Sequence, residues 1–347
     1  MAIDGIFDTN ALVHTVRNLK VPSQFLLNTF FPNVMEADTD FVSIDVDVGL
    51  RRMSPFVSPI MEGSMVEARQ FQTNTFKPAY IKDLRTPDFR RPVLRAMGER
   101  IGGDMTGEER VQANLAFEMI DQIQMVDRRL EWMAAQALQV GSYTIQGDGF
   151  NTVALSFNRA SALTVALSGS ALWTQANITA GTASPSQNIE TWDQLILQKG
   201  GASATDIVFT TGAYNAFVLD PRVQQSVWYL RSGESKVDFG GGNLIHGAKP
   251  KGEWGGYRLW LYNDWYINSA GVETPMIAGN QIIMTSSALE GVRAFGMILD
   301  DDFAYKSLAY APKSWVPPNP ARRHLLMQSA PVVIPSRVNA SFAATVA

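Results

Sequence analysis

Few side chains in this sequence are of the types that catalyse reactions, and their spacing fits no catalytic site. The histidines are His14, His246 and His324, and none has a second histidine one helical turn away, so they predict no metal site. The acidic run 300–302 carries oxygen ligands that suit a hard cation, but such a run is more typical of a solvated turn. These residues favour packing and surface roles over chemistry.

The motifs of nucleotide-binding proteins and hydrolases are also missing from the sequence. The glycine run at 239–243 has no Lys-Ser or Lys-Thr pair after it, so it predicts a flexible loop rather than a phosphate cradle. No Gly-x-Ser-x-Gly elbow occurs. Trp132, Trp260, Trp265 and Trp315 suit core or interface packing better than ligand stacking. With no cysteine available for thiolate or metal chemistry, we predict a protein that is not an enzyme and uses no cofactor or metal.

Composition points to a folded protein with fewer charged residues than usual. Hydrophobic residues make up 46% and charged residues 18% of the 347 residues, and the charged share lies below the usual ~25%. A subunit of a large assembly fits this balance, and so does a compact monomer with a mildly polar surface. The net charge of −4 argues against a dedicated nucleic-acid binder. The sequence shows neither the features of a secretory signal nor an apolar run long enough to span a membrane, so we expect a soluble protein.

The first third of the chain predicts an arm, a hairpin and a long helix. Residues 1–41 form an arm with no core of its own, which must lie on its own chain or on a neighbour. Residues 42–83 predict an extended hairpin, because apolar and polar residues alternate over 42–51 and a polar segment returns over 66–76. The hairpin either projects from the body and gains support from a partner or packs on its own domain.

Residues 84–188 are assigned to one domain built on a spine helix at about 107–140. A connector rich in Arg, Pro and Gly fills 84–105, and Thr106 with Glu109 forms a capping box. One apolar stripe follows the helix to Gly141, where a left-handed turn ends it. The predicted polar faces carry Glu118, Asp121, Asp127, Arg128 and Glu131. A β-hairpin at 143–157 and a loop at 168–188 complete the domain.

The remaining residues predict a second domain and a returning tail. Residues 189–303 read as one α+β domain, with a helix at 189–198, helices broken at Asp220–Pro221 and a glycine-rich mobile loop at 232–256. The strands of this domain are expected at 207–211, 257–267, 281–285 and 292–299. Residues 304–347 are proline-rich and largely extended.

Five short segments form a pattern in the hairpin and the tail: 57–63 and 76–82 in the hairpin, and 310–316, 319–322 and 327–331 in the tail. In their order and spacing these segments resemble the phage major capsid protein E family, the lambda-type coat proteins. The signature residues are Pro59, Gly63, Pro78, Tyr80, Pro312, Lys313, Trp315, Pro320, Arg322, Gln328, Ser329, Ala330 and Pro331.

The resemblance implies the α+β fold of tailed-phage major capsid proteins, also called the Hong Kong 97-like fold. In that fold the N-terminal arm and the extended hairpin loop embrace neighbouring subunits. A peripheral domain carries the spine helix, an axial domain lies at the capsomer centre, and the C-terminal segment 304–347 completes both. The connector 85–100 departs from the family, because it is shorter and more basic than expected.

The resemblance also implies a function and partners. The chain would assemble as hexamers and pentamers into the icosahedral head, through a procapsid stage, around the double-stranded DNA of a tailed bacteriophage. It would be assembled in the host bacterial cytoplasm and reside in the virion, without a membrane. The implied partners are further copies of the chain, a scaffolding protein, a portal and a decoration protein, with packaged DNA contacted non-specifically.

Charged residues of the hairpin are the candidate contacts between subunits. Exposed ion pairs each contribute about 0–1 kcal/mol, so these residues would set register more than affinity. Two alternatives stay open: an encapsulin-like compartment shell of the same fold, and a soluble α+β ligand-binding enzyme, which would need a concave site with convergent titratable groups. The candidate contacts are Arg51, Arg52, Glu62, Glu67, Arg69 and Lys77.

Overall fold

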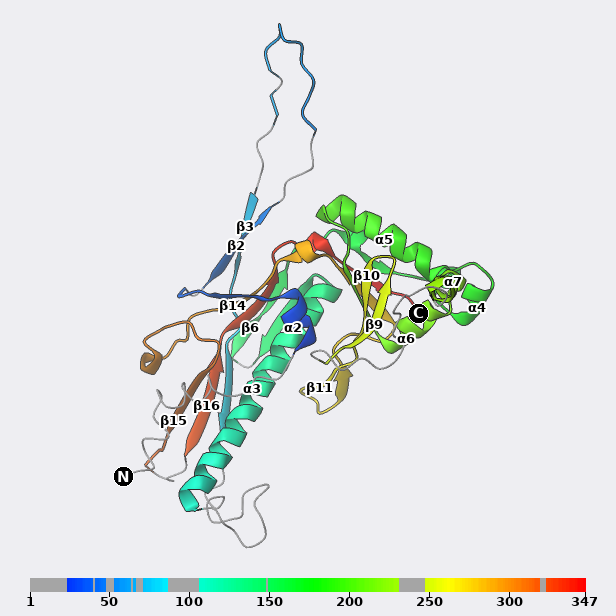
Figure 1. Cartoon of the computed structure of the whole chain (residues 1–347). Coiled ribbons are helices and arrows are strands. Elements are labelled where there is room, and N and C mark those ends of the chain that lie inside the picture. The colour runs from blue at the N-terminus through cyan, green and yellow to red at the C-terminus, as the bar shows by residue number, and fades with distance from the viewer. Residues whose placement is uncertain are drawn as a thin grey trace. The chain divides into compact units, whose positions relative to one another are not determined.

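The chain divides into two compact units, each built from several segments (Figure 1). The computed structural model describes residues 24–39, 41–47, 53–63, 65–66, 71–86, 106–147, 149–230, 247–318 and 323–347. Unit 1 comprises Met1–Val42, Lys77–Ala134 and Val292–Val333, and unit 2 comprises Ser43–Phe76, Ala135–Gly291 and Ile334–Ala347. Both mix helices and strands, as an α+β fold requires. No helix in the described part of the chain is long and apolar enough to cross a membrane.

Unit 1 contains most of α3 (Gly107–Gln139), the predicted spine helix. The predicted capping box starts it, because Thr106 N donates to Glu109 Oε2 at 2.7 Å and Glu109 N donates to Thr106 Oγ1 at 3.3 Å. The apolar stripe is buried as expected from Leu115 to Leu138. The expectation for the polar faces is wrong at Glu118, Asp127 and Glu131, which are at most 8% exposed because other segments of unit 1 cover them.

An antiparallel three-stranded sheet, ordered β15–β16–β4, lies along α3 in unit 1 (Figure 1). Gln122 of α3 is fully buried, and its Nε2 donates to Asp83 O of the sheet at 3.0 Å. The prediction of a connector is wrong at Leu84 and Arg85, which belong to a strand; residues 87–105 lie outside the described residues. The strands are β4 (Ile81–Arg85), β15 (Ala311–Trp315) and β16 (His324–Ser329).

The described part of the predicted arm packs within unit 1. It contains a short helix that the irregular apolar spacing did not predict, and Phe25, Leu26, Leu27 and Phe31 are completely buried. The next strand pairs in parallel with β14 in a three-stranded sheet ordered β1–β14–β17. These elements are α2 (Phe25–Phe30), β1 (Asn33–Glu36), β14 (Gly291–Phe295), β17 (Pro331–Pro335) and the 3₁₀ helix η5 (Asp301–Phe303).

Unit 2 is organised around a six-stranded sheet ordered β7–β18–β13–β8–β10–β9. β8 pairs with β10 in parallel and with β13 in antiparallel fashion, and all of its residues are buried. The predicted single strand at 257–267 is divided into β10 and β11. The strands of this sheet are β7 (Thr164–Ala166), β8 (Asp206–Phe209), β9 (Lys249–Trp254), β10 (Tyr257–Leu261), β13 (Gln281–Thr285) and β18 (Ser341–Thr345).

Helices and aromatic rings form the core of unit 2 with this sheet. The Trp192 ring stacks between Trp173 and Phe342, with centroids 5.7 and 5.0 Å away. The helix break at Asp220–Pro221 is confirmed, because the Asp220 carboxylate accepts from Arg222 N at 2.9 Å at the start of the next helix. The helices are α4 (Gln175–Thr179), α5 (Pro185–Gly200), α6 (Thr211–Val218) and α7 (Pro221–Leu230), with 3₁₀ helices η2 (Ser161–Leu163), η3 (Gly169–Ala171), η4 (Ser287–Leu289) and η6 (Val338–Ala340).

Two loop predictions in unit 2 are wrong in part. The segment 168–188 contains η3, α4 and the start of α5, since Thr174 caps α4 and Pro185 starts α5. Of the predicted loop at 232–256, residues 232–246 lie outside the described residues, together with the glycine run, and 249–254 form β9.

Three two-stranded hairpins complete unit 2. The predicted extended hairpin has paired strands at its base, where Ser43 Oγ and Thr75 Oγ1 lie 3.4 Å apart. Phe76 at its end packs on Phe157, with ring centroids 5.4 Å apart. The hairpins are β2 (Val42–Asp47) with β3 (Phe71–Phe76), β5 (Ser142–Gly147) with β6 (Phe150–Ser156), and β11 (Trp265–Ile267) with β12 (Glu273–Pro275).

Arg159 closes the C-terminal end of α3 in unit 2. The predicted left-handed turn is present at Gly141, which has φ of 74°. The Arg159 guanidinium donates to Leu138 O at 2.6 Å, to Gln139 O, and to Thr164 Oγ1 at 2.7 Å. Its charge therefore satisfies two of the helix's last carbonyl groups and opposes the negative end of the helix dipole.

Replacing Arg159 by methionine is expected to lower the free energy of unfolding by about 1–2 kcal/mol, because two buried carbonyl groups lose a charged donor. Burial lowers the pKa of Arg159 to about 10, so the side chain is protonated at neutral pH and the cost is the same at pH 6 and pH 8. Urea unfolding at both pH values measures it. Arg159→Lys is the control, and it should recover part of the loss. A variant as stable as the wild type would contradict the capping role.

Candidate functional site

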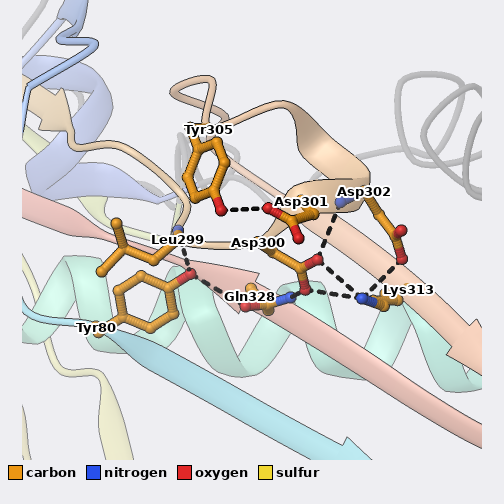
Figure 2. A network of polar contacts seen from close by, with 8 residues as sticks. All are labelled: Tyr80, Leu299, Asp300, Asp301, Asp302, Tyr305, Lys313 and Gln328. Atoms are coloured by element: carbon orange, nitrogen blue, oxygen red, sulfur yellow. Dashed lines mark hydrogen bonds and ion pairs between the residues drawn. The ribbon is translucent and has the colours of Figure 1, made fainter.

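Three signature residues of the sequence meet around Asp300 in unit 1 (Figure 2). Lys313 Nζ donates to Asp300 Oδ1 at 2.8 Å and to Oδ2 at 3.0 Å. Gln328 Nε2 donates to Asp300 Oδ2 at 2.9 Å, and Tyr80 OH donates to Gln328 Oε1 at 3.0 Å. Leu299 N in turn donates to the Tyr80 oxygen at 2.9 Å. The network ties the loop at 299–305 to the sheet below it.

The strand register explains why these side chains meet. Gln328 of β16 is paired with Ala311 of β15, two residues before Lys313, so the two polar side chains lie diagonally on one face of the sheet. Asp300 stands before η5, and its Oδ1 accepts from Asp302 N at 3.1 Å. Burial alone would raise the pKa of Asp300, but the hydrogen bonds from Lys313 and Gln328 outweigh it and hold the pKa below its usual value.

The expectation of a solvated turn at 300–302 is wrong for Asp300. Its side chain is only 16% exposed and is held by the network, whereas the residues Asp301 and Asp302 are exposed. Lys313 also pairs with Asp302 at 2.7 Å, so an ammonium group bridges the two carboxylates. Within the described residues, no group of three His, Asp or Glu side chains is placed to hold a metal ion.

Most other signature residues build unit 1 as well. Pro78 lies against Gly296, where a Cβ would come within 2.7 Å of Pro78 Cγ, so a side chain there would displace the proline. Gly296 N donates to Ala330 O at 2.8 Å. Trp315 stacks on His324 with ring centroids 5.2 Å apart. Pro312, Ser329 and Pro331 are buried in strands, while Pro320 and Arg322 lie outside the described residues.

Replacing Lys313 by methionine is expected to lower the free energy of unfolding by about 1 kcal/mol. The change removes an ion pair that is partly exposed and leaves Asp300 with weaker partners. Lys313 helps to hold the pKa of Asp300 down. The difference in unfolding free energy between the wild type and Lys313→Met should therefore shrink as acid protonates Asp300. Urea unfolding of both proteins across acid and neutral pH measures this. If this difference in unfolding free energy stayed constant down to pH 3, the contacts of Lys313 with Asp300 would not be its cause.

The tip of the extended hairpin is the most exposed apolar segment in the described part of unit 2. The turn spans Ser58 to Met61, with Pro59 as its second residue, and Met61 N donates to Ser58 O at 3.0 Å. Around it, Phe56 is 104% and Ile60 95% exposed. We define the hairpin tip by its exposed apolar residues: Met53, Phe56, Val57, Ile60, Met61, Met65 and Val66.

The charged candidates on the hairpin fall partly within the described residues. Arg51, Arg52, Glu67 and Arg69 lie outside the described residues. Glu62 is exposed at the tip, next to Gly63, which has open space where a Cβ would be. In unit 1, Lys77 lies over the Phe41 ring of its own chain, 5.6 Å from the ring centroid. Pairing of these residues between subunits stays a prediction.

Sequence reasoning missed the apolar character of the tip. The alternation of apolar and polar residues over 42–51 predicts a strand, and the charged residues near it are the evident candidates for contacts. The informative signal was the number of large apolar residues among turn residues, from Met53 to Met65. Turn segments rarely expose contiguous apolar surface unless it is covered by a partner.

Comparison with solved structures defines the class of the fold. The putative capsid protein of a prophage from Escherichia coli CFT073 superposes with a TM-score of 0.74 over 98% of this chain and 99% of that chain, at 18% identity. A phage-related protein from Bordetella bronchiseptica RB50 superposes with a TM-score of 0.55 over 96% of this chain and 95% of that chain, at 12% identity. The fold is that of the tailed-phage major capsid proteins, the Hong Kong 97-like class, which confirms the expected α+β fold class.

The chain belongs to the phage major capsid protein E family, whose model matches residues 8–346. The major capsid protein of Escherichia phage lambda is 25% identical over 89% of this chain and 89% of that protein. The major capsid protein of Enterobacteria phage P21 is 23% identical over 95% of this chain and 96% of that protein. The resemblance predicted from the hairpin and tail segments is therefore confirmed.

Membership of this family decides between the classes of function left open by the sequence. The chain is a major capsid protein of a tailed phage, a structural component of the virion that assembles into a multimeric shell. It is not an enzyme, and the family match favours the phage coat over an encapsulin-like compartment.

Proposed function

We propose that the chain assembles as hexamers and pentamers into the icosahedral head that encloses the double-stranded DNA of a tailed bacteriophage. Assembly takes place in the host bacterial cytoplasm, with a scaffolding protein, a portal and a decoration protein as partners. The working layout is an arm at 1–41, a hairpin loop at 42–83, a peripheral domain at 84–188, an axial domain at 189–303 and a returning segment at 304–347. Family membership supports this proposal.

The exposed hairpin tip is the observation that carries the assembly step. A segment with seven large apolar side chains in water is unfavourable for a lone chain, and full burial of one such side chain gains about 1.5–3 kcal/mol. Association costs an estimated 4–15 kcal/mol, so several of these side chains must be buried together. The occupant that a shell protein meets repeatedly is a second copy of itself. The tip supplies affinity, and Glu62 with the charged residues around it supplies register.

The double variant Phe56→Ser/Ile60→Ser tests this step. Both side chains are almost fully exposed, so the folded chain loses little, and its circular dichroism and thermal unfolding should match those of the wild type. In size exclusion and negative-stain electron microscopy, alone and with a candidate scaffolding protein, the wild type should form closed shells. The variant should remain folded and unassembled.

A matched control carries the same chemical change elsewhere in unit 2. Leu197→Ser/Leu219→Ser also replaces two exposed apolar residues, which are 40% and 39% exposed. We expect this control to form shells. Shell formation by the tip variant at the wild-type yield would contradict the proposal, and so would equal loss of shells in both variants.

A further inference from the structure

Methionines provide three of the most exposed apolar side chains of the hairpin tip. Met53 is 90%, Met61 72% and Met65 101% exposed. The methionines of the core contrast with them, since Met119, Met284 and Met327 have no exposed surface at all. The chain therefore presents thioether sulfurs to solvent at the very segment proposed to dock on a second copy.

Exposed thioethers react with peroxides, whereas buried ones are protected. The sulfur lone pair attacks one oxygen of hydrogen peroxide, the O–O bond breaks, an S–O bond forms and water leaves. The methionine is oxidised by two electrons and the peroxide is reduced. The product is methionine sulfoxide, a polar side chain that methionine sulfoxide reductases convert back.

Oxidation makes the methionine side chains of the tip more costly to bury in an apolar interface. A thioether fills an irregular apolar pocket well because it is flexible and polarizable. A sulfoxide carries a strong hydrogen-bond acceptor, and burying it without a donor costs free energy. Three sulfoxides within one short segment therefore oppose the burial that docking requires.

We propose that Met53, Met61 and Met65 form a reversible oxidation site that controls whether the hairpin tip can dock on a second copy of the chain. This inference rests on the proposed function of the tip. In its reduced form the tip is competent for assembly, and in its oxidised form it is not. Once a shell has closed, docking shields the same sulfurs from peroxide.

The experiment starts from unassembled wild-type protein treated with dilute hydrogen peroxide and then with catalase. Peptide mass spectrometry should show sulfoxide first at the three tip methionines and not at Met119 or Met284. We expect the yield of closed shells to fall at least about tenfold, because the same weakened contact recurs at every copy of the tip in the shell. Treatment with both methionine sulfoxide reductases should restore the yield.

Two variants locate the effect. Met53→Leu/Met61→Leu/Met65→Leu keeps the apolar volume without sulfur, so it should assemble and remain competent after peroxide. Met35→Leu/Met125→Leu removes two half-exposed methionines outside the tip and should stay as sensitive as the wild type. If the triple variant lost assembly after peroxide as the wild type does, oxidation would act elsewhere and the inference would be wrong.

A second measurement does not depend on variants. Shells assembled first and then exposed to peroxide should oxidise at the tip methionines at least about tenfold more slowly than unassembled chains. Equal rates would overturn the inference, and so would normal assembly of chains that carry all three sulfoxides. If Phe56→Ser/Ile60→Ser assembled normally, the proposed docking itself would be wrong. Loss of assembly in that variant, with no effect of oxidation, would remove only the present inference.

Discussion

Replacing Glu131 by alanine is expected to lower the free energy of unfolding by about 3 kcal/mol and to release the segment around α2. Glu131 is 2% exposed, and its Oε1 accepts from Leu26 N at 2.9 Å while Oε2 accepts from Leu27 N at 3.1 Å. These N–H groups stand in the first turn of α2 and have no partner within that helix. Each buried donor left unsatisfied costs about 1–3 kcal/mol.

The measurement needs a chain that does not assemble, because binding between copies would raise the apparent stability. We would therefore introduce Glu131→Ala into the Phe56→Ser/Ile60→Ser background and compare urea unfolding. Glu131→Gln is the control, since its amide oxygen still accepts one of the two bonds and should retain about half of the stability. Limited proteolysis near 24–31 reports release of the segment. Unchanged stability and unchanged cleavage in the alanine variant would show that Glu131 does not hold α2.

Local signals account for the elements that could be predicted. α3 was predictable because its start, stripe and end lie in one continuous stretch: the capping box at Thr106, the apolar stripe and Gly141. The strand order in unit 2 was not predictable, since the C-terminal β18 inserts between β7 and β13 from far along the chain. β9 was not predictable because Pro250 and Gly252 interrupt any alternation of apolar and polar residues. Its antiparallel pairing with β10 holds the segment as a strand.

The polar contacts of unit 1 show a different limit of sequence reasoning. Tyr80, Lys313 and Gln328 belong to the signature of the sequence, but their meeting at Asp300 depends on the pairing of β16 with both β15 and β4. Likewise, Glu118, Asp127 and Glu131 lie off the apolar stripe of α3, which predicts that they face water, but they are buried. Helical periodicity identifies only the most apolar face of a helix. It carries no information about segments remote in sequence that cover the other faces of α3.

Asp127 provides the second large expected effect, on the pH dependence of stability. It is 1% exposed on α3, and Tyr310 OH donates to its Oδ1. Burial raises the pKa of Asp127 from 3.8 to about 6, against the opposing effects of Tyr310, Gln24 and the positive charge of Arg293. Because the pKa in the folded chain exceeds that of the unfolded chain, protonation favours folding. This stabilisation is fully present below pH 3.8 and is lost as pH rises through about 6.

Asp127→Asn keeps the shape of the side chain and removes its charge. We expect little change in stability at pH 4 and a gain of up to about 3 kcal/mol at pH 8, since about two pH units correspond to about 1.36 kcal/mol each. Urea unfolding of both proteins from pH 4 to pH 8, in the unassembled background, gives the difference, in which the other titrating groups cancel.

Tyr310→Phe tests the assigned cause from the opposite side. The hydroxyl lowers the pKa of Asp127, so its removal should raise that pKa further and move the loss of stability to higher pH. A difference between wild type and Asp127→Asn that stays flat from pH 4 to pH 8 would contradict a buried carboxylate that ionises at a cost. If the difference follows the expected course, the two buried carboxylates Asp127 and Glu131 of α3 have opposite effects on the stability of unit 1. Glu131 stabilises the segment around α2 through its two hydrogen bonds to backbone N–H groups. Asp127, on the preceding turn of α3, lowers the stability of unit 1 when it is ionised.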